Sequence, residues 1–340
     1  MSTGRLSDVD ERDVHVRPGK SSRPRTKERP GHTAAVLGTV IAQDRGRYTC
    51  LPGPADEPPD ASASPVTAVK ARELGRSSVV VGDRVRLVGD MSGGRDALAR
   101  IVGTLPRRTV LRRTADDDDP FERVVVANAD QLVVVTALAD PPPRPHLIDR
   151  CVAAAFDAGL APLLCLTKAD LAPADALLAM YAPLDLDVVV TSRDDPVDVL
   201  ADRLAGRVSV LVGHSGVGKS TLVNAVIPGA GRSTGVVNAV TGRGRHTSTS
   251  AVAIPLPGGG WVVDTPGVRS FGLAHLSPAT LIRAFGDLDA ATVDCPRGCL
   301  HTAASPECAL DLWAADRRVE PARVASFRRL LESRDRRDDD

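Results

Sequence analysis

The sequence predicts a multidomain chain: a small β-barrel, a central α/β domain built on a parallel sheet, and a C-terminal helical domain with a Cys/His cluster. Three observations predict this division. Short β-like runs fill about residues 34–113, apolar runs alternate with helix-like stretches over 120–273, and three of the six cysteines crowd into 295–308. A length of 340 residues suits two or three domains.

Composition and charge favour an ordinary globular protein. Apolar residues make up 43% of the chain and charged residues 25%. The 43 basic residues equal the 43 acidic ones, so a nucleic-acid partner has to be met by a local basic surface. No run approaches 18 apolar residues, and the first residues are polar and charged, so we expect no membrane span, no secretion signal and a cytoplasmic location.

Residues 1–33 are basic and almost free of apolar side chains. Such a segment cannot bury enough surface to offset its ordering entropy, so we expect it to be disordered. Two interpretations stay open: a basic arm that contacts RNA phosphates, and a solvated tail without a partner.

Residues 34–113 are expected to form the barrel. Glycine-containing turns separate the short β-like runs, and the Pro-rich stretch 52–65 is expected to be a surface loop. The runs are 35–41, 47–51, 66–71, 78–81, 84–88 and 97–105. Several arginines make this part basic, which suits RNA binding, although a barrel is also an ordinary packing unit.

An acidic hinge at 116–119 precedes the α/β domain. Continuous Val/Leu runs that alternate with helices are typical of a parallel sheet covered on both faces. The runs are 124–126, 132–135, 162–166, 188–190 and 208–212, and the helices 146–158, 173–181 and 197–204. From residue 277 onward we expect helices.

A phosphate-binding loop is predicted where the run 208–212 meets a helix at 221–226. The segment Gly213–Thr221 reads GHSGVGKST and matches the P-loop pattern, in which glycines let backbone N–H groups surround phosphate oxygens. Lys219 reaches the β- and γ-phosphates, and the Ser220 hydroxyl ligates Mg²⁺. The expected nucleotide contacts here are Gly213, His214, Ser215, Gly216, Val217, Gly218, Lys219, Ser220 and Thr221.

A guanine-reading motif follows the run 162–166. Thr167-Lys168-Ala169-Asp170 is similar to the Asn-Lys-x-Asp of GTPases, where the Asp carboxylate accepts hydrogen bonds from guanine N1–H and the 2-amino group, and the Lys stem covers the base. Thr167 stands in place of Asn and weakens the motif without removing the Asp170 contact. Ser192, after the next run, is a weaker candidate for a second base-contacting loop.

The magnesium and γ-phosphate side is predicted at Asp264-Thr265-Pro266-Gly267, which ends the strand 261–263. Asp264 is expected to hold magnesium through its water shell, and the Gly267 N–H to lie near the γ-phosphate. In ordinary GTPases the P-loop precedes the guanine motif, whereas here Asp170 precedes Lys219. A parallel sheet tolerates this order if the chain is circularly permuted, because strand neighbours build the site.

Together these motifs resemble the ribosome small-subunit-dependent GTPase A family (RsgA, also called YjeQ). The resemblance covers about residues 34–335. Its matching segments are Val80–Val85, Ala127–Gln131, Gly213–Thr221, Thr241–Thr247 and Asp264–Gly272.

The resemblance implies an OB-fold barrel at 34–113, a circularly permuted GTPase domain at 120–273 and a zinc-binding helical domain at 274–335. It also implies GTP hydrolysis that is stimulated by the small (30S) ribosomal subunit and its 16S rRNA during late maturation, and that controls release from the subunit. The expected cofactors are GTP as substrate, Mg²⁺ and one structural Zn²⁺, and we expect a monomer.

The catalytic group is not the usual one. The position after Asp-x-x-Gly holds a water-orienting Gln in Ras-like proteins, and here it is Val268, so we expect slow intrinsic turnover. His246 is the candidate that supplies or positions the missing group once rRNA orders the switch segment 242–249; an ordinary RNA or structural contact is the alternative. Thr247, Ser248 or Thr249 is expected to complete the magnesium shell.

Cys295, Cys299, His301 and Cys308 offer three thiolates and one imidazole. That is a closed tetrahedral set for structural Zn²⁺, with free thiols as the alternative. The family usually spaces these ligands as Cys-x4-Cys-x-His-x5-Cys; here the first gap is one residue shorter and the last one longer.

Three rival functions stay open on the residues alone. The first rival is a P-loop ATPase or kinase, against which Asp170 argues, because its carboxylate is expected to recognise guanine. A non-catalytic RNA-binding zinc module would not need Lys219, Ser220 and Asp264. The third rival is a GTPase that acts on another RNA or on the large ribosomal subunit. Only the family resemblance argues against it.

Overall fold

The computed structural model describes residues 34–54, 58–75, 78–94, 96–114, 122–227, 251–265, 273 and 276–334. The predictions for the tail 1–33, the hinge 116–119, the switch segment with His246 and Thr247, and Gly267 lie outside the described residues.

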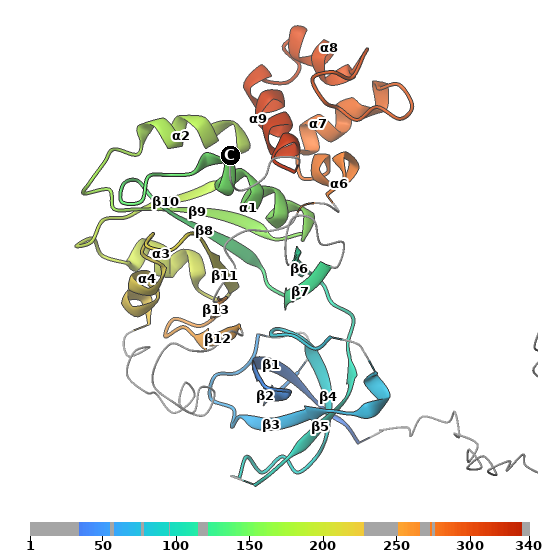
Figure 1. Ribbon diagram of the computed structural model, residues 1–340, viewed down its shortest axis with the longest axis vertical. Coiled ribbons are helices and arrows are strands. Elements are labelled where there is room, and N and C mark those ends of the chain that lie inside the picture. The colour runs from blue at the N-terminus through green and yellow to red at the C-terminus, as the bar shows by residue number, and fades with distance from the viewer. Residues whose placement is uncertain are drawn as a thin grey trace, which may run out of the picture. The chain divides into compact units, whose positions relative to one another are not determined.

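Five strands close into a small barrel (Figure 1). They are β1 (Val36–Asp44), β2 (Arg47–Pro52), β3 (Val66–Lys70), β4 (Arg84–Gly89) and β5 (Ala99–Thr104). Their order is β1-β2-β3-β5-β4, and β4 returns to pair with β1. Alternate side chains such as Val40, Val85 and Ile101 are fully buried inside. The predicted OB-like barrel is confirmed.

Two strand predictions were wrong: one segment forms no strand, and another pairs with a different strand than expected. Residues 78–81 form no strand beyond one bridge at Val81, because the buried Asp83 carboxylate accepts the Val80 N–H at 2.8 Å and turns the chain. The run 124–126 lies in β7 (Glu122–Ala127), which pairs antiparallel with β6 (Val110–Thr114) in a separate two-stranded sheet instead of joining the parallel sheet.

The central sheet has the parallel order β10-β9-β8-β11-β13. Its strands are β8 (Gln131–Ala137), β9 (Ala161–Thr167), β10 (Asp187–Val190), β11 (Val208–Val212) and β13 (Trp261–Asp264). A further strand, β12 (Val252–Pro255), was not expected from the sequence; it is an antiparallel neighbour of β13 and also bridges to β1 at Ala42. Parallel strands place their carboxyl ends at one edge, where nucleotide sites form.

Helices cover both faces of this sheet, as predicted (Figure 1). They are α1 (Pro145–Asp157), α2 (Asp175–Tyr181), α3 (Asp198–Leu204) and α4 (Lys219–Val226). Leu132 and Val134 of β8 pack in one core cluster with α1 and α2, whereas the alternating Val133 and Val135 pack with α3 and α4. Within the described residues, no helix is long and apolar enough to cross a membrane.

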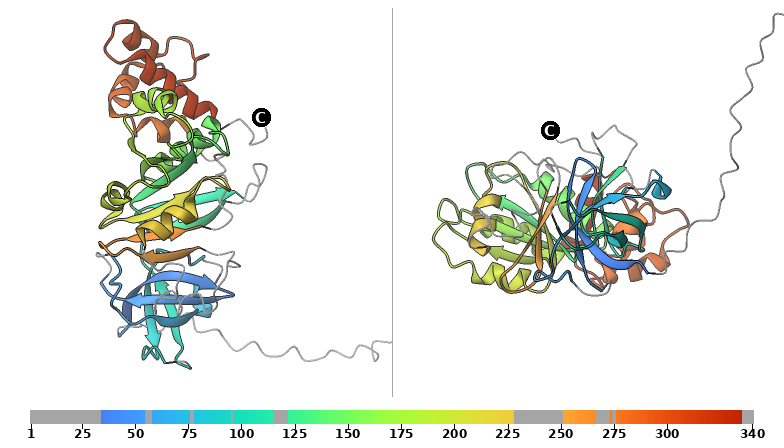
Figure 2. Two further views of the ribbon diagram at one scale, coloured as in Figure 1. Left: turned by 90° about the vertical axis from the view of Figure 1, so that its left-hand side faces the viewer. Right: turned by 90° about the horizontal axis from the view of Figure 1, so that it is seen from below.

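The C-terminal part is helical, as predicted (Figure 2). Its helices are α6 (Pro278–Ile282), α7 (Gly286–Ala291), α8 (Ala309–Ala315) and α9 (Pro321–Glu332). Phe285 and Phe327 are buried in the same core cluster as α1. Phe285 makes edge-to-face contacts with Phe156 at 5.4 Å and with Phe327 at 5.6 Å between ring centroids. This module therefore packs on the α1 face of the sheet.

Candidate nucleotide site and Cys/His cluster

The P-loop leaves β11 at Gly213 and enters α4 at Lys219. Gly213 has no space for a side chain, because a Cβ there would lie 2.2 Å from the carbonyl oxygen of Val135. Gly216 and Gly218 adopt φ values of 83° and 96°, which favour glycine. The Lys219 ammonium donates to the carbonyls of Gly213 and His214, so backbone oxygens of the P-loop itself hold the ammonium group.

The guanine motif lies against the P-loop. Thr167 is buried at the carboxyl end of β9, and its hydroxyl donates to the carbonyl oxygen of Val217 at 2.7 Å. The two motifs therefore lie side by side in space although the guanine motif precedes the P-loop in the sequence, as expected for a circularly permuted chain. Thr167 contacts the P-loop through this hydroxyl, a role that the sequence alone could not assign.

The base side of the site is built from two neighbouring loops. Asp170 is exposed, and its carboxylate accepts a long hydrogen bond of 3.4 Å from the Arg193 N–H. Ala169 N–H donates to the Thr191 carbonyl at 3.2 Å, so the segment around Ser192 runs beside the guanine motif. The Ser192 N–H donates to Asp195 at 2.6 Å, which holds the pKa of that carboxyl below its usual range.

Lys168 has a φ of 60°, and its ammonium donates to the carbonyl of Asp140, in the segment between β8 and α1. This contact was not visible in the sequence, because no motif links Lys168 to residue 140.

Asp264 lies at the same edge of the sheet as the P-loop. It pairs in register with Leu211, one residue before the end of β11, and the next side chain, Thr265, donates to the Leu211 carbonyl at 3.2 Å. Ser220 and Thr221 are exposed in the first turn of α4. The structure thus brings the predicted phosphate-side residues that it describes to one place.

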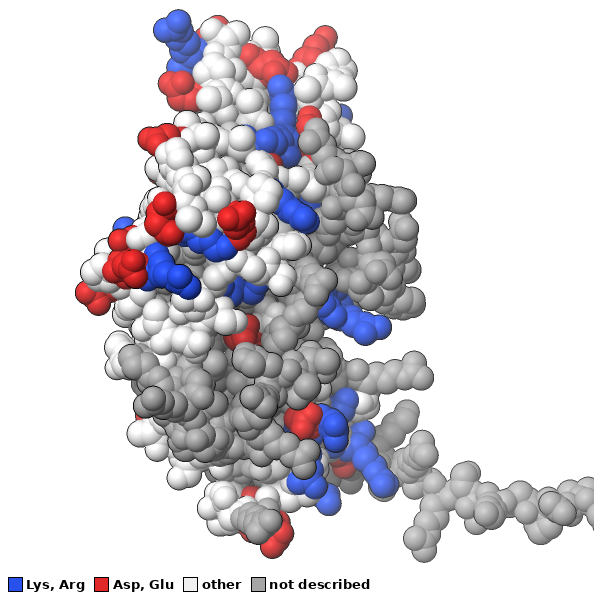
Figure 3. Space-filling view, turned by 60° about the vertical axis from the view of Figure 1, so that its left-hand side comes forward, with Lys and Arg blue, Asp and Glu red and all other residues white. Residues whose placement is uncertain are grey.

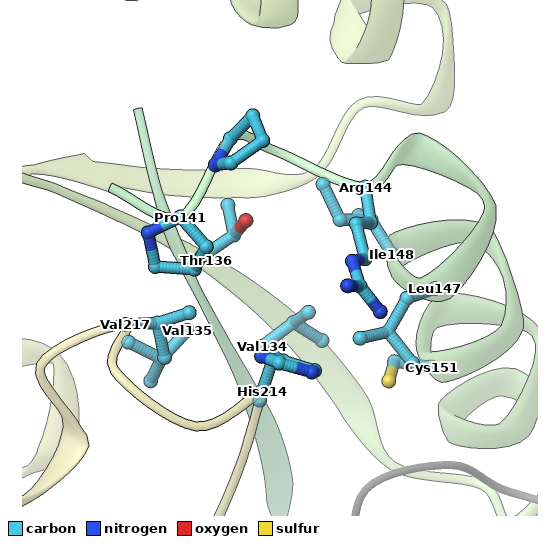
Figure 4. A pocket seen from close by; sticks show the side chains of 12 residues that line it. Val134, Val135, Thr136, Pro141, Arg144, Leu147, Ile148, Cys151, His214 and Val217 are labelled. Atoms are coloured by element: carbon cyan, nitrogen blue, oxygen red, sulfur yellow. The ribbon is translucent and has the colours of Figure 1, made fainter. Parts of the chain in front are cut away.

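A mostly apolar pocket flanks the P-loop (Figure 4). Its floor comes from β8 and its wall from α1, including Leu147, Ile148 and Cys151. Arg144, the residue before α1, and His214 of the P-loop also line it (Figure 4). An apolar lining does not suit a triphosphate, so the pocket adjoins the phosphate site and does not form it.

The four predicted metal ligands converge in the C-terminal module. The ligand atoms of Cys295, Cys299, His301 and Cys308 all lie within 4.8 Å of one another. His301 Nδ1 is 3.6 Å from Cys295 Sγ and 3.9 Å from Cys308 Sγ. A tetrahedral Zn²⁺ site with its usual bond lengths has S···N edges of about 3.6 Å, so the residues fit this ion.

The surroundings act differently on the four ligands: burial raises the pKa of Cys308 to about 11, which opposes formation of its thiolate. Burial and the nearby Arg328 charge lower the pKa of His301, which keeps its imidazole neutral. The Ala309 N–H donates to Cys295 Sγ at 3.3 Å, a contact that stabilises a thiolate. Arg328 donates to the His301 carbonyl and forms a two-point ion pair with Asp311, which ties the ligand loop to α8 and α9.

Comparison with known proteins agrees with this geometry. A sequence model of the RsgA GTPase family matches residues 104–274. The chain is 40% identical over 267 residues to the small ribosomal subunit biogenesis GTPase RsgA of Pseudomonas aeruginosa, covering 75% of this chain and 76% of that protein. It is 41% identical over 267 residues to the RsgA of Pseudomonas savastanoi pv. phaseolicola, covering 75% of each.

Two solved structures share the fold. YjeQ from Thermotoga maritima is 24% identical, with a TM-score of 0.64 over 89% of this chain and 100% of that one. YloQ, described as a circularly permuted GTPase, is 25% identical, with a TM-score of 0.62 over 91% of this chain and 99% of that one. With the P-loop and the guanine motif joined at one sheet edge, the chain belongs to the RsgA GTPase family and is a GTP hydrolase.

Proposed function

We propose that this GTPase acts in the late maturation of the small (30S) ribosomal subunit, as a monomer in the cytoplasm. Contact with 16S rRNA stimulates GTP hydrolysis, and hydrolysis controls release from the subunit. The names of the 40%-identical relatives support the subunit assignment. The RNA contact is supported by arginines exposed on the barrel and the adjoining β6; on the face drawn in Figure 3, basic side chains gather at the level of the barrel. The exposed arginines include Arg72, Arg86, Arg100 and Arg112.

In this proposal the P-loop Gly213–Thr221 binds the phosphates through its backbone N–H groups and Lys219. Asp170 reads the guanine, and the stem of Lys168 and the Ser192 loop flank the base. Thr167 positions the base loop against the phosphate loop through Val217. The opposite ends of one nucleotide are thereby held by parts of a single rigid sheet edge.

Magnesium supplies positive charge that offsets charge on the phosphates during transfer. Ser220 and one of Thr247, Ser248 and Thr249 are proposed to hold it, with Asp264 acting through the water shell. Gly267 is proposed to donate its N–H near the γ-phosphate.

His246 is proposed to supply or position the catalytic group that Val268 cannot provide. His246→Ala is then expected to abolish subunit-stimulated hydrolysis and to leave GTP affinity within twofold of wild type. Stimulated turnover equal to that of wild type would show that His246 is an ordinary RNA or structural contact.

The Cys/His cluster is proposed to hold one structural Zn²⁺. Cys295, Cys299, His301 and Cys308 would together supply the four ligands of a structural Zn²⁺ site, with no position left open for catalysis. Metal analysis of the purified chain should give about one zinc per molecule, and Cys299→Ser should lower that stoichiometry.

The hydrogen bond from Thr167 to Val217 carries the nucleotide assignment, because it joins the two motifs. The deciding experiment is GTP turnover with and without purified small subunits, with ATP and large subunits as controls. We expect slow turnover alone, strong stimulation by the small subunit, and little activity on ATP. Equal stimulation by large subunits, or none by small ones, would contradict the proposed role.

A further inference from the structure

We propose that Arg329 of α9 is a positioning residue for the guanine side of the nucleotide site, acting through Asp149, Tyr181 and the segment 140–145. The C-terminal module thereby sets the affinity for guanine nucleotides. This inference rests on the base site proposed above, with Lys168 and Asp170 as its members.

The first step is the contact of Arg329 with two elements of the GTPase core. Its Nε donates to both carboxylate oxygens of Asp149 on α1, at 3.1 and 3.2 Å. Its guanidinium also lies over the ring of Tyr181, the last residue of α2, 5.2 Å from the ring centre. One side chain of α9 therefore fixes α1 relative to the end of α2.

The second step leads from this contact to the nucleotide loops. The Tyr181 hydroxyl donates to the carbonyl of Pro145, the first residue of α1, at 3.0 Å. Pro145 ends the segment that begins at Asp140, whose carbonyl accepts from the Lys168 ammonium. A Cβ at Gly216 of the P-loop would lie 3.6 Å from Pro141 Cδ, so the same segment also lies against the phosphate loop.

The energetics favour a role in orientation over one in stability. The Asp149 side chain is only 5% exposed, and burial raises its pKa despite the opposing charge of Arg329. A buried ion pair with such a net penalty contributes little to folding free energy compared with an apolar pair. Its geometric effect remains, because the Nε–H of Arg329 is shared between both carboxylate oxygens, which holds one edge of the planar guanidinium against Asp149.

A second, apolar contact keeps the module attached when Arg329 is changed. Phe156 near the end of α1 meets Phe285, which in turn meets Phe327 of α9. Removing the charge pair is therefore expected to loosen one end of α1 and to leave the module folded on the core.

The test measures the dissociation constants of fluorescent GDP and of a slowly hydrolysed GTP analogue on the full chain. We expect Arg329→Gln and Tyr181→Phe each to raise both constants by roughly three- to tenfold. The shift should be equal for the two nucleotides, because both carry the same base. The kcat should change much less than KM, because Lys219 of the phosphate loop is untouched. Arg329→Lys keeps the charge without the planar guanidinium and its Nε–H and should fall between wild type and Arg329→Gln.

The matched control is Asp311→Asn, which removes the ion pair with Arg328 at 2.7 Å inside the same module. It should lower the melting temperature without changing nucleotide affinity. Simple destabilisation by Arg329→Gln would instead reduce the number of binding sites per chain and leave the dissociation constant of the folded fraction unchanged.

Nucleotide affinity within twofold of wild type for both Arg329→Gln and Tyr181→Phe would overturn the inference, as would an equal loss in Asp311→Asn. The underlying base site is tested separately with Asp170→Asn, which should lose the preference for GTP over inosine triphosphate, a nucleotide without the 2-amino group. If that preference persists, the base site itself is misassigned; if it is lost while Arg329→Gln binds normally, only the positioning role fails.

Discussion

Thr167 joins the two halves of the nucleotide site through a single buried hydroxyl. Thr167→Val keeps the shape of the side chain and leaves the Val217 carbonyl without this donor, which costs about 1–3 kcal/mol when the group is buried. We expect weaker binding of GDP and GTP alike, measured by fluorescence titration. Thr167→Ser retains the hydroxyl and serves as the control. Equal affinity in the Val and Ser variants would contradict the bridging role.

Asp195 shapes the second base loop by accepting the Ser192 N–H. Asp195→Ala should free this loop beside Asp170 and raise the dissociation constant for GDP by roughly two- to fivefold, the usual effect of one net hydrogen bond. The neighbouring Asp194 is also exposed and offers the matched control, Asp194→Ala, which should bind GDP normally. Equal effects of the two substitutions would indicate a general charge effect and not loop positioning.

Single residues also show what sequence reasoning can find. The P-loop and the four metal ligands are local patterns whose spacing carries their chemistry, and the structure brings each set together. Arg329 and Asp149 follow no pattern, because their pairing joins residues 180 positions apart. Their type alone suggests solvated surface charges, and only the packing of α9 on α1 explains why one of them is buried.

At the scale of elements, the strands of the central sheet were predictable because they are continuous apolar runs between helices. The run 124–126 has the same composition and still joins a different sheet, where it pairs with β6. The short β12 was missed because a strand of four residues, only one of them buried, gives little periodic signal. Partner choice between strands depends on distant segments, which local composition does not encode.

The contact between α1 and α9 predicts a pH dependence of stability. Burial raises the pKa of Asp149 above its ordinary value of 3.8, with Arg329, Tyr181 and His146 as the charged or titratable groups around it. A raised folded-state pKa means that protonation favours the folded state: the contribution is fully present below the ordinary pKa and is lost as pH rises through the folded one.

Asp149→Asn cannot titrate at this position and should lack that dependence. The free energy of unfolding of wild type minus that of Asp149→Asn, from urea titrations between about pH 4 and 7, should therefore shrink as pH rises. Groups elsewhere, including the Cys/His cluster, titrate in both proteins and cancel in the difference. A difference that stays constant or grows with pH would contradict the burial-dominated shift.

At the scale of the whole molecule, one hydrophobic cluster runs from the barrel through the central sheet to the C-terminal helices. It includes Ile41 and Leu51 of the barrel, Leu132 of β8, and Phe285 and Phe327 of the C-terminal module. The barrel adds polar links: Asn128 donates to the Gly82 carbonyl at 2.9 Å, and Trp261 Nε1 donates to the Pro59 carbonyl at 2.8 Å. The barrel also has a core cluster of its own, which includes Val40, Val85 and Ile101, so the shared cluster is an additional apolar link between the barrel and the central sheet.

Shared apolar surface makes a prediction for removal of the metal proposed at the Cys/His cluster. Chelation removes the link between the ligand loop and α8, while α9 stays packed in the common cluster. The whole chain should therefore still unfold in one calorimetric transition, shifted down by about 5 °C or more, since a structural zinc contributes directly to folding free energy. Cys299→Ser should show the lower transition without chelator and no further shift with it. Two separate transitions after chelation would mean that the C-terminal module unfolds on its own, and that its contact with α1 is too weak to transmit anything to the nucleotide site.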